Sequence, residues 1–123
     1  MEADRTRSVM VVEDDEVYRE LLVLGLALEG FEAIQAENGA VAADLLQNHT
    51  PDVLLVDMLM PVMDGLRFLH WLKNEAKLNI PTLVLTCLDG RSIAVDALVA
   101  GASDVLIKPI TLEALVDKIA TVA

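Results

Sequence analysis

Residues 53–65 read VLLVDMLMPVMDG and begin with an unbroken apolar run from Val53 to Val56. The absence of polar alternation in this run indicates a strand buried on both faces of a parallel sheet. The acid Asp57 follows the run directly, and a loop closed by Asp64 and Gly65 leads into a segment of helical period. We therefore predict a strand, a carboxylate at its end, and a helix over residues 66–77.

The same rhythm of apolar runs and helical segments extends over the rest of the chain. Further strands are predicted at 9–12, 31–36, 82–85 and 104–107, and further helices at 16–29, 40–48, 91–100 and after Thr111 as N-cap. Parallel strands need crossover connections, and these are right-handed. The pattern predicts an α/β fold, in which a doubly wound sheet of five parallel strands carries five helices on its two faces.

The composition supports one folded domain and argues against several classes of partner. The chain has 123 residues, of which 54% are hydrophobic, so it can build a core without metal or disulfides. Nine basic residues against 20 acidic ones give a net charge of −11, the wrong sign for neutralising a phosphate backbone. We therefore expect no direct binding of nucleic acid.

The sequence predicts a cytoplasmic location. The single cysteine, Cys87, cannot form an internal disulfide. The longest apolar runs are much shorter than the roughly 20 residues of a membrane span. Residues 1–8 are polar and lack the apolar centre of a signal peptide. We expect neither membrane insertion nor export.

Chemically active side chains follow four of the predicted strands. Glu13 and Asp14 follow the first strand, Asp57 the third, Thr86 the fourth and Lys108 the fifth. Ligands of open parallel sheets bind beyond the carboxyl ends of the strands, where these residues gather. Clustered carboxylates repel one another unless a cation compensates, and a hard ion such as Mg²⁺ or Mn²⁺ suits them. With such an ion, Asp57 can act as a nucleophile toward phosphorus, while Lys108 balances charge and Thr86 donates a hydrogen bond.

Taken together, these motifs resemble the receiver domains of bacterial two-component response regulators, over essentially the whole chain. The motifs that carry the resemblance are Val12-Glu13-Asp14-Asp15, the stretch from Val56-Asp57 to Asp64-Gly65, Leu85-Thr86, Gly101-Ala102-Ser103-Asp104 and Lys108-Pro109. The resemblance implies a flavodoxin-like sheet with strand order 2-1-3-4-5. It also implies that residues 1–123 form a single receiver domain.

The resemblance assigns a role to each residue of the acidic cluster. Asp57 is expected to accept a phosphoryl group from a histidine kinase or a histidine phosphotransfer protein. Asp14 is expected to bind Mg²⁺ directly and Glu13 through water, with the backbone carbonyl of Leu59 as a further ligand. The chain would then be a switch that promotes only its own phosphorylation and dephosphorylation, and not an enzyme acting on metabolites.

Two further roles also come from the resemblance. Lys108 is expected to pair with Asp57 in the resting state and with the phosphoryl oxygens afterwards. Thr86 is expected to move onto the phosphoryl group. The Lys108–Pro109 peptide is expected to be cis, which is an accessible isomer only before proline.

Several other residues have simpler interpretations. Asp15 and Asp64 are predicted to cap helices, because aspartate is favoured there. Cys87 is predicted to be a small, weakly polar residue at a strand end, since nothing indicates a lowered thiol pKa. His49 and His70 are predicted to lie on the surface.

The sequence departs from the family pattern at three positions. Val105 stands where many receivers have Tyr or Phe, so the usual aromatic reporter of phosphorylation is absent. Leu59 and Leu88, two residues after Asp57 and after Thr86, are apolar and cannot orient an attacking water. We therefore hypothesise slow hydrolysis of the phosphorylated state.

An excess of apolar side chains on two helical segments favours association with a partner or a second copy. Residues 92–100 are apolar nearly all round, and Leu21, Leu24 and Leu28 add to a segment that one buried face cannot absorb. The resemblance points to a dimer or to contact with the phosphodonor.

Two other functions remain open. A hydrolase with an aspartyl nucleophile would need a second acid where Leu59 stands. A degenerate receiver that acts as a phosphorylation-independent docking or dimerisation module is kept open by Val105.

Overall fold

The computed structural model describes residues 6–58, 60, 63–87 and 91–122. Within this part of the chain, the strands are β1 (Ser8–Val12), β2 (Glu32–Ala36), β3 (Val53–Asp57), β4 (Thr82–Thr86) and β5 (Asp104–Ile107). The helices are α1 (Glu16–Leu28), α2 (Gly39–Leu46), α3 (Gly65–His70), the π-helix η2 (Trp71–Glu75), α4 (Arg91–Val99) and α5 (Leu112–Val122).

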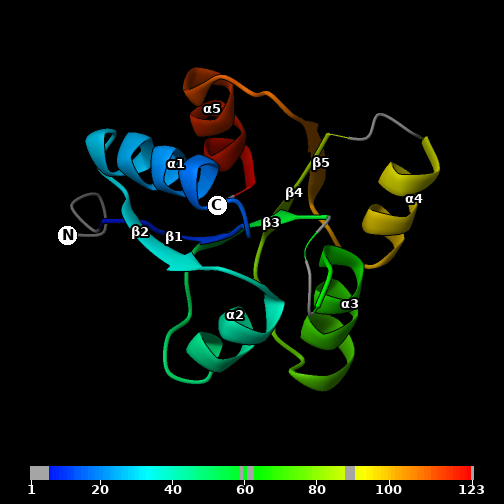
Figure 1. The fold of residues 1–123 in the computed structure, drawn as a ribbon. Coiled ribbons are helices and arrows are strands. Elements are labelled where there is room, and N and C mark those ends of the chain that lie inside the picture. The colour runs from blue at the N-terminus through cyan, green and yellow to red at the C-terminus, as the bar shows by residue number, and fades with distance from the viewer. Residues whose placement is uncertain (1–5, 59, 61–62, 88–90, 123) are drawn as a thin grey trace.

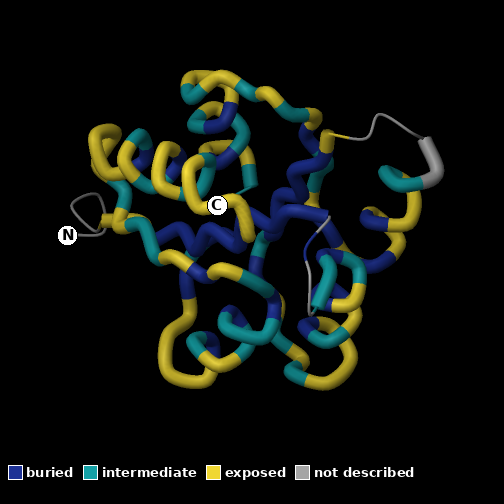
Figure 2. Tube along the Cα trace, in the orientation of Figure 1, coloured by how far each residue is buried: buried dark blue, intermediate teal, exposed yellow. Residues whose placement is uncertain are grey.

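The five strands form one parallel sheet in the order β2-β1-β3-β4-β5, which confirms the predicted architecture (Figure 1). Every residue of the central strands β1, β3 and β4 is buried, as Figure 2 shows along the middle of the molecule. Burial on both faces explains why these three strands read as continuous apolar runs.

Two layers of helices cover the sheet. On one face, α1 and α5 pack Leu22, Leu26, Leu115 and Ile119 against the sheet. On the other face, α2 and α3 cover strands β2, β1 and β3, and α4 packs next to α3 (Figure 1). Because all five strands are parallel, their carboxyl ends lie at one edge of the sheet, where ligands of such folds bind.

Local capping signals place the helix ends as predicted. Asp15 accepts the amide hydrogen of Tyr18 at 3.1 Å, and Asp64 accepts that of Arg67 at 2.9 Å. Thr111 caps α5 through the amide of Ala114 at 3.1 Å. At the other end of α1, Gly30 has a φ of 94°, a conformation that glycine adopts without strain.

The third helix differs from the prediction of one α-helix over residues 66–77. The α-helix ends at His70 and continues as the π-helix, in which the amide of Ala76 donates to the carbonyl of Trp71 at 2.9 Å. The wider turn keeps Leu72 buried while the ring of Trp71 stacks on that of Phe68 at 5.9 Å. A period of 3.6 residues cannot reveal such an insertion, because the apolar positions on either side of it still look helical.

The second helix is shorter than predicted, since it ends at Leu46 and not at residue 48. The amides of Asn48 and His49 both donate to the carbonyl of Leu45, which closes the helix as a turn before Pro51. In the described residues, no helix has the length and apolar character needed to cross a bilayer.

Candidate functional site

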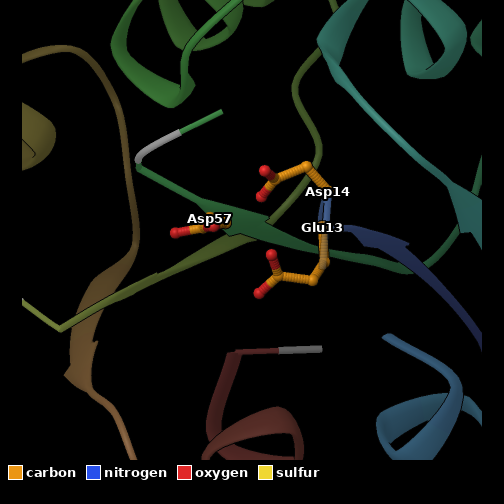
Figure 3. A group of neighbouring side chains, drawn as sticks. All are labelled: Glu13, Asp14 and Asp57. Atoms are coloured by element: carbon orange, nitrogen blue, oxygen red, sulfur yellow. The ribbon is translucent and has the colours of Figure 1, made fainter. Parts of the chain in front are cut away.

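Three carboxylates meet where β1 and β3 end. Val12 of β1 lies opposite Val56 of β3, so the next residues on the two strands are Glu13 and Asp57. One carboxylate oxygen from each of Glu13, Asp14 and Asp57 lies within 4.8 Å of the other two. Figure 3 shows the three side chains gathered at this edge of the sheet. The parallel register therefore creates the cluster that the sequence predicted from strand ends.

The three carboxylates differ in burial and in hydrogen bonding. Glu13 is 1% exposed, and its two oxygens accept from Lys108 at 2.6 Å and from the amide of Asp15 at 3.1 Å. Asp57 is 7% exposed, whereas Asp14 is exposed. Asp57 is therefore shielded, and Asp14 forms the solvent side of the cluster.

Lys108 brings a positive charge into the cluster from the end of β5. Its Nζ lies 2.6 Å from Glu13 Oε1 and 3.5 Å from Asp57 Oδ2. Its backbone amide donates to the carbonyl of Thr86 at 2.8 Å, which fixes the residue beside β4. The Lys108–Pro109 peptide is cis, as predicted. Lys108 does contact Asp57, but its shorter contact is with Glu13.

The surroundings of Lys108 favour its charged form. Burial lowers the pKa of Lys108, but the hydrogen bond to Glu13 and the negative charges of Asp57 and Glu13 raise it more. The net shift of the pKa is therefore upward. An ammonium held in this way can balance negative charge that develops beside Asp57.

Thr86 ends β4 next to the carboxylates. It is 1% exposed, and the neighbouring Leu85 lies in register with Asp57. Val105 lies half-buried in β5, opposite Val84. The two leucines tied to the hydrolysis hypothesis, Leu59 and Leu88, lie outside the described residues, and so does the predicted carbonyl ligand of Leu59.

The carboxylates have the right chemistry for a hard divalent ion. They offer one oxygen each, all within 4.8 Å of one another, and carboxylate oxygens are the protein ligands that Mg²⁺ prefers. Asp14 is exposed, so an ion can enter from solvent. Glu13 already accepts two hydrogen bonds, which favours contact through water for this residue.

Three residues support the site although the sequence analysis gave them no role in it. Arg19 of α1 donates to the backbone carbonyl of Glu13 at 2.8 Å, and the ring of Tyr18 lies under Lys108 Nζ. A Cβ atom at Gly65 would lie 2.7 Å from the carbonyl oxygen of Asp57, so only glycine fits there. Helical spacing places Tyr18 and Arg19 on the first turn of α1, but it does not reveal what they touch.

Other predicted features lie on the surface. His49 and His70 are exposed, as predicted. Cys87, which directly follows β4, is exposed as well. Two groups of large apolar side chains are also exposed: Val17, Leu21, Leu24 and Leu28 on α1, and Val95, Leu98 and Val99 on α4 with Ile107 on β5. We call these the α1 patch and the α4 patch. They confirm that both helices carry apolar residues that the core does not use.

Comparisons with known proteins agree with this geometry. The protein-family model described as the response regulator receiver domain matches residues 9–120. "Response regulator MprA" of Mycobacterium sp. (strain KMS) is 39% identical over 110 residues, which cover 89% of this chain and 47% of that protein. The chain thus spans about half the length of this relative.

Solved structures show the same likeness. A signal receiver domain of a signal transduction histidine kinase from Syntrophus aciditrophicus is 31% identical, with a TM-score of 0.86 over 95% of this chain and 89% of that one. The Vibrio cholerae chemotaxis protein CheY4 is 27% identical, with a TM-score of 0.91 over 97% of this chain and 100% of that one.

Proposed function

The chain belongs to the response regulator receiver domain family, and we propose that it is a phosphorylation switch whose acceptor is Asp57. The observation that carries this proposal is the position of Asp57, shielded at the end of β3, within 4.8 Å of Glu13 and Asp14 and 3.5 Å from Lys108. We extend the domain to residues 1–123, because the one sheet and the family match span nearly all of them.

The proposed reaction transfers a phosphoryl group between two side chains. A carboxylate oxygen of Asp57 forms a bond to phosphorus, while the bond between phosphorus and the imidazole nitrogen of a phosphohistidine breaks. The electron pair of the broken bond stays with that nitrogen. The donor is a histidine kinase or a histidine phosphotransfer protein, as for response regulators in general. Lys108 stabilises the charge on the phosphoryl oxygens as the transfer proceeds.

Mg²⁺ or Mn²⁺ fits the donor set, and we assign Asp14 and Asp57 as direct ligands with Glu13 through water. When bound, the ion supplies positive charge that offsets the repulsion between carboxylates and phosphoryl oxygens. The carbonyl of Leu59 is a further proposed ligand. The surrounding residues hold Asp57 in a shielded position, and Lys108 lies 3.5 Å from one of its carboxylate oxygens.

The output of the proposed switch is a change of surface and of partner. Thr86 can donate its hydroxyl hydrogen to a phosphoryl oxygen, and its backbone carbonyl accepts from the amide of Lys108, which directly follows β5. The α4 patch includes residues of α4 and Ile107 of β5, and these two elements are in contact, so a movement at the end of β5 can change this apolar surface. We place the domain in the cytoplasm, which is typical of the family, and assign it no catalytic role beyond its own phosphorylation and dephosphorylation.

The phosphoacceptor can be tested by intact-protein mass spectrometry after incubation with acetyl phosphate. We expect a gain of one phosphoryl group that requires Mg²⁺ and is lost in Asp57→Asn. Asp44→Asn, which removes an exposed carboxylate on α2, serves as the matched control and retains the gain. A folded wild-type protein that binds Mg²⁺ and gains no phosphoryl group would contradict the proposal and favour the phosphorylation-independent docking module.

We also propose that phosphorylation promotes a homodimer through the α4 patch. Val95, Leu98 and Val99 are exposed on α4, and α4 contacts β5, which carries the exposed Ile107. Exposed apolar side chains on neighbouring elements are typical of an interface. Sedimentation of the phosphorylated protein is expected to show a dimer that Leu98→Glu abolishes. The control Leu24→Glu, in the α1 patch, keeps the dimer. Loss of the dimer in the control alone would assign the interface to α1 instead.

A further inference from the structure

Lys108 is held by an aromatic ring as well as by carboxylates. Its Nζ lies 4.7 Å from the centroid of the Tyr18 ring, over the face of that ring. This distance is well within the roughly 6 Å at which an ammonium is attracted by an aromatic face. The side chain of Lys108 is 19% exposed, so the attraction acts in a partly desolvated place where it is stronger than on an open surface.

The ring of Tyr18 is one of a series of contacts that links Lys108, Glu13, Asp15 and Tyr18 and returns to Lys108. One oxygen of Glu13 accepts from Lys108 at 2.6 Å, and the other accepts from the amide of Asp15 at 3.1 Å. Asp15 in turn accepts from the amide of Tyr18 at 3.1 Å. The last contact of the series is between the ammonium of Lys108 and the ring of Tyr18. The start of α1 and the end of β5 are therefore connected through both the carboxylate and the tyrosine.

The hydroxyl group of Tyr18 forms no strong hydrogen bond. Its oxygen is fully buried and, in the part of the chain that the structure describes, has no partner at full hydrogen-bonding geometry, although the backbone of Ile110 lies close enough to act on its pKa. Burial raises the pKa of Tyr18, so the group stays protonated near neutral pH. Tyr18 packs against the buried apolar cluster between the sheet and helices α1 and α5, as Ile110 and Leu112 also do. The functional part of the side chain is thus the ring face that Lys108 covers.

We propose that Tyr18 is a positioning residue for Lys108, which it holds between Glu13 and Asp57 by the interaction of the ammonium with the ring face. This inference rests on the proposed function, since it assigns a supporting residue to the same phosphoryl transfer. A ring keeps the flexible lysine side chain ordered without neutralising its charge. An aliphatic residue of similar size fills the same space but offers no negative face to the ammonium.

The contact can be measured without any phosphorylation. The protein has four lysines, and nuclear magnetic resonance with labelled lysine resolves the methylene protons next to each Nζ. We expect the Lys108 signal, assigned with Lys108→Arg, to lie upfield because of the ring current. Tyr18→Phe keeps this shift, and Tyr18→Leu removes it. Lys118, which pairs with Asp104 at 2.7 Å, keeps its shift in both variants. An unchanged Lys108 signal in Tyr18→Leu would overturn the proposal.

The effect on transfer is measured as the initial rate with acetyl phosphate at saturating Mg²⁺. Tyr18→Phe is expected to remain within about twofold of wild type, and Tyr18→Leu to be about 2- to 30-fold slower. In the Lys108→Met background, Tyr18→Leu is expected to cause no further loss. Equal loss in Tyr18→Phe and Tyr18→Leu would assign the effect to the hydroxyl group. An added loss without Lys108 would show that Tyr18 acts only in packing. Either result would overturn the proposal.

Two controls separate the possible causes of failure. Tyr18→Met is a second aliphatic variant, to be used with circular dichroism if Tyr18→Leu does not fold, and the same loss of shift and rate is expected. If the wild-type protein is not phosphorylated at all, the proposed function fails while the ring-current shift still decides whether Tyr18 holds Lys108.

Discussion

The Nζ of Lys108 lies 2.6 Å from Glu13 and 3.5 Å from Asp57, so the ammonium is bound more closely to Glu13 than to Asp57, the proposed acceptor. Glu13 is almost fully buried and would be an uncompensated charge without this contact. The arrangement leaves Asp57 less tightly engaged by Lys108. A lysine in this position competes with a divalent ion for the same carboxylates.

The competition predicts opposite effects of two substitutions on Mg²⁺ affinity. Lys108→Met removes a positive charge that repels Mg²⁺, and it is expected to tighten Mg²⁺ binding several-fold. Glu13→Gln removes a negative charge and is expected to weaken it about 10- to 100-fold, as losses of outer-shell ligands do. Isothermal titration calorimetry with MgCl₂ measures both affinities.

Glu16→Gln is the control for these measurements, because Glu16 is an exposed acid on the first turn of α1. It is expected to bind Mg²⁺ with nearly the affinity of the wild type. If Glu16→Gln and Glu13→Gln weaken Mg²⁺ binding equally, the net negative charge of the protein, and not the carboxylate cluster, attracts the ion.

Gly65→Ala is expected to destabilise the fold. The new Cβ would lie 2.7 Å from the carbonyl oxygen of Asp57 and 2.8 Å from the Cα of Met58, and these backbone atoms cannot move aside cheaply. We expect a loss of about 1–3 kcal/mol in the free energy of unfolding. Urea unfolding followed by circular dichroism gives this value.

Gly25→Ala is the matched control, since its Cβ would meet only the flexible end of Leu112, at 3.1 Å. Alanine is also favoured over glycine inside a helix such as α1. We therefore expect this variant to be neutral or stabilised, and similar losses in both variants would argue against the close approach at Gly65.

The surface pair between Asp104 and Lys118 is expected to give a pH-dependent stability. The hydrogen bond from Lys118, at 2.7 Å, outweighs burial and lowers the pKa of Asp104 below its ordinary 3.8. A carboxylate with a lowered pKa in the folded state stabilises the protein above its unfolded pKa and loses this contribution as the pH falls through the folded value. Both side chains are more than a third exposed, so the gain is small, about 0.2–1 kcal/mol.

The test compares urea midpoints of wild type and Asp104→Asn between neutral and acid pH. The wild type is expected to be more stable at pH near 6, and the difference is expected to shrink below pH 3.8. Asp117→Asn, which changes an exposed carboxylate on α5, is the control. A difference that grows toward acid pH would have the wrong sign for this interaction.

The phosphorylated state is expected to be long-lived, because Leu59 and Leu88 cannot orient a water molecule. Replacing them together by Leu59→Asn and Leu88→Glu is expected to speed hydrolysis by about tenfold or more. The decay of the phosphorylated mass after removal of the donor measures the rate. Leu28→Asn, at an exposed leucine of α1, should leave it unchanged. No faster decay in the double variant would count against the hypothesis.

Much of the fold could be predicted from local patterns. The apolar runs of β1, β3 and β4 identify buried parallel strands, and Asp15, Asp64 and Thr111 mark helix starts because each caps the amide three residues ahead. The positions of Asp57 and Lys108 at strand ends follow from the same patterns. The π-helix after His70 could not be predicted in this way, because the one extra residue in its turn leaves the spacing of the apolar residues almost unchanged.

The sequence alone determined which side chains lie at the edge of the sheet that holds the candidate site, because the carboxyl ends of parallel strands all lie on one side. Only the tertiary structure decided how those side chains pair. Lys108 and Glu13 are far apart in the sequence, and their 2.6 Å contact depends on how β5 and β1 are held in one sheet. The ring of Tyr18 under Lys108 depends in addition on where α1 crosses that sheet. Such contacts are set by the packing of distant elements, which no local pattern encodes.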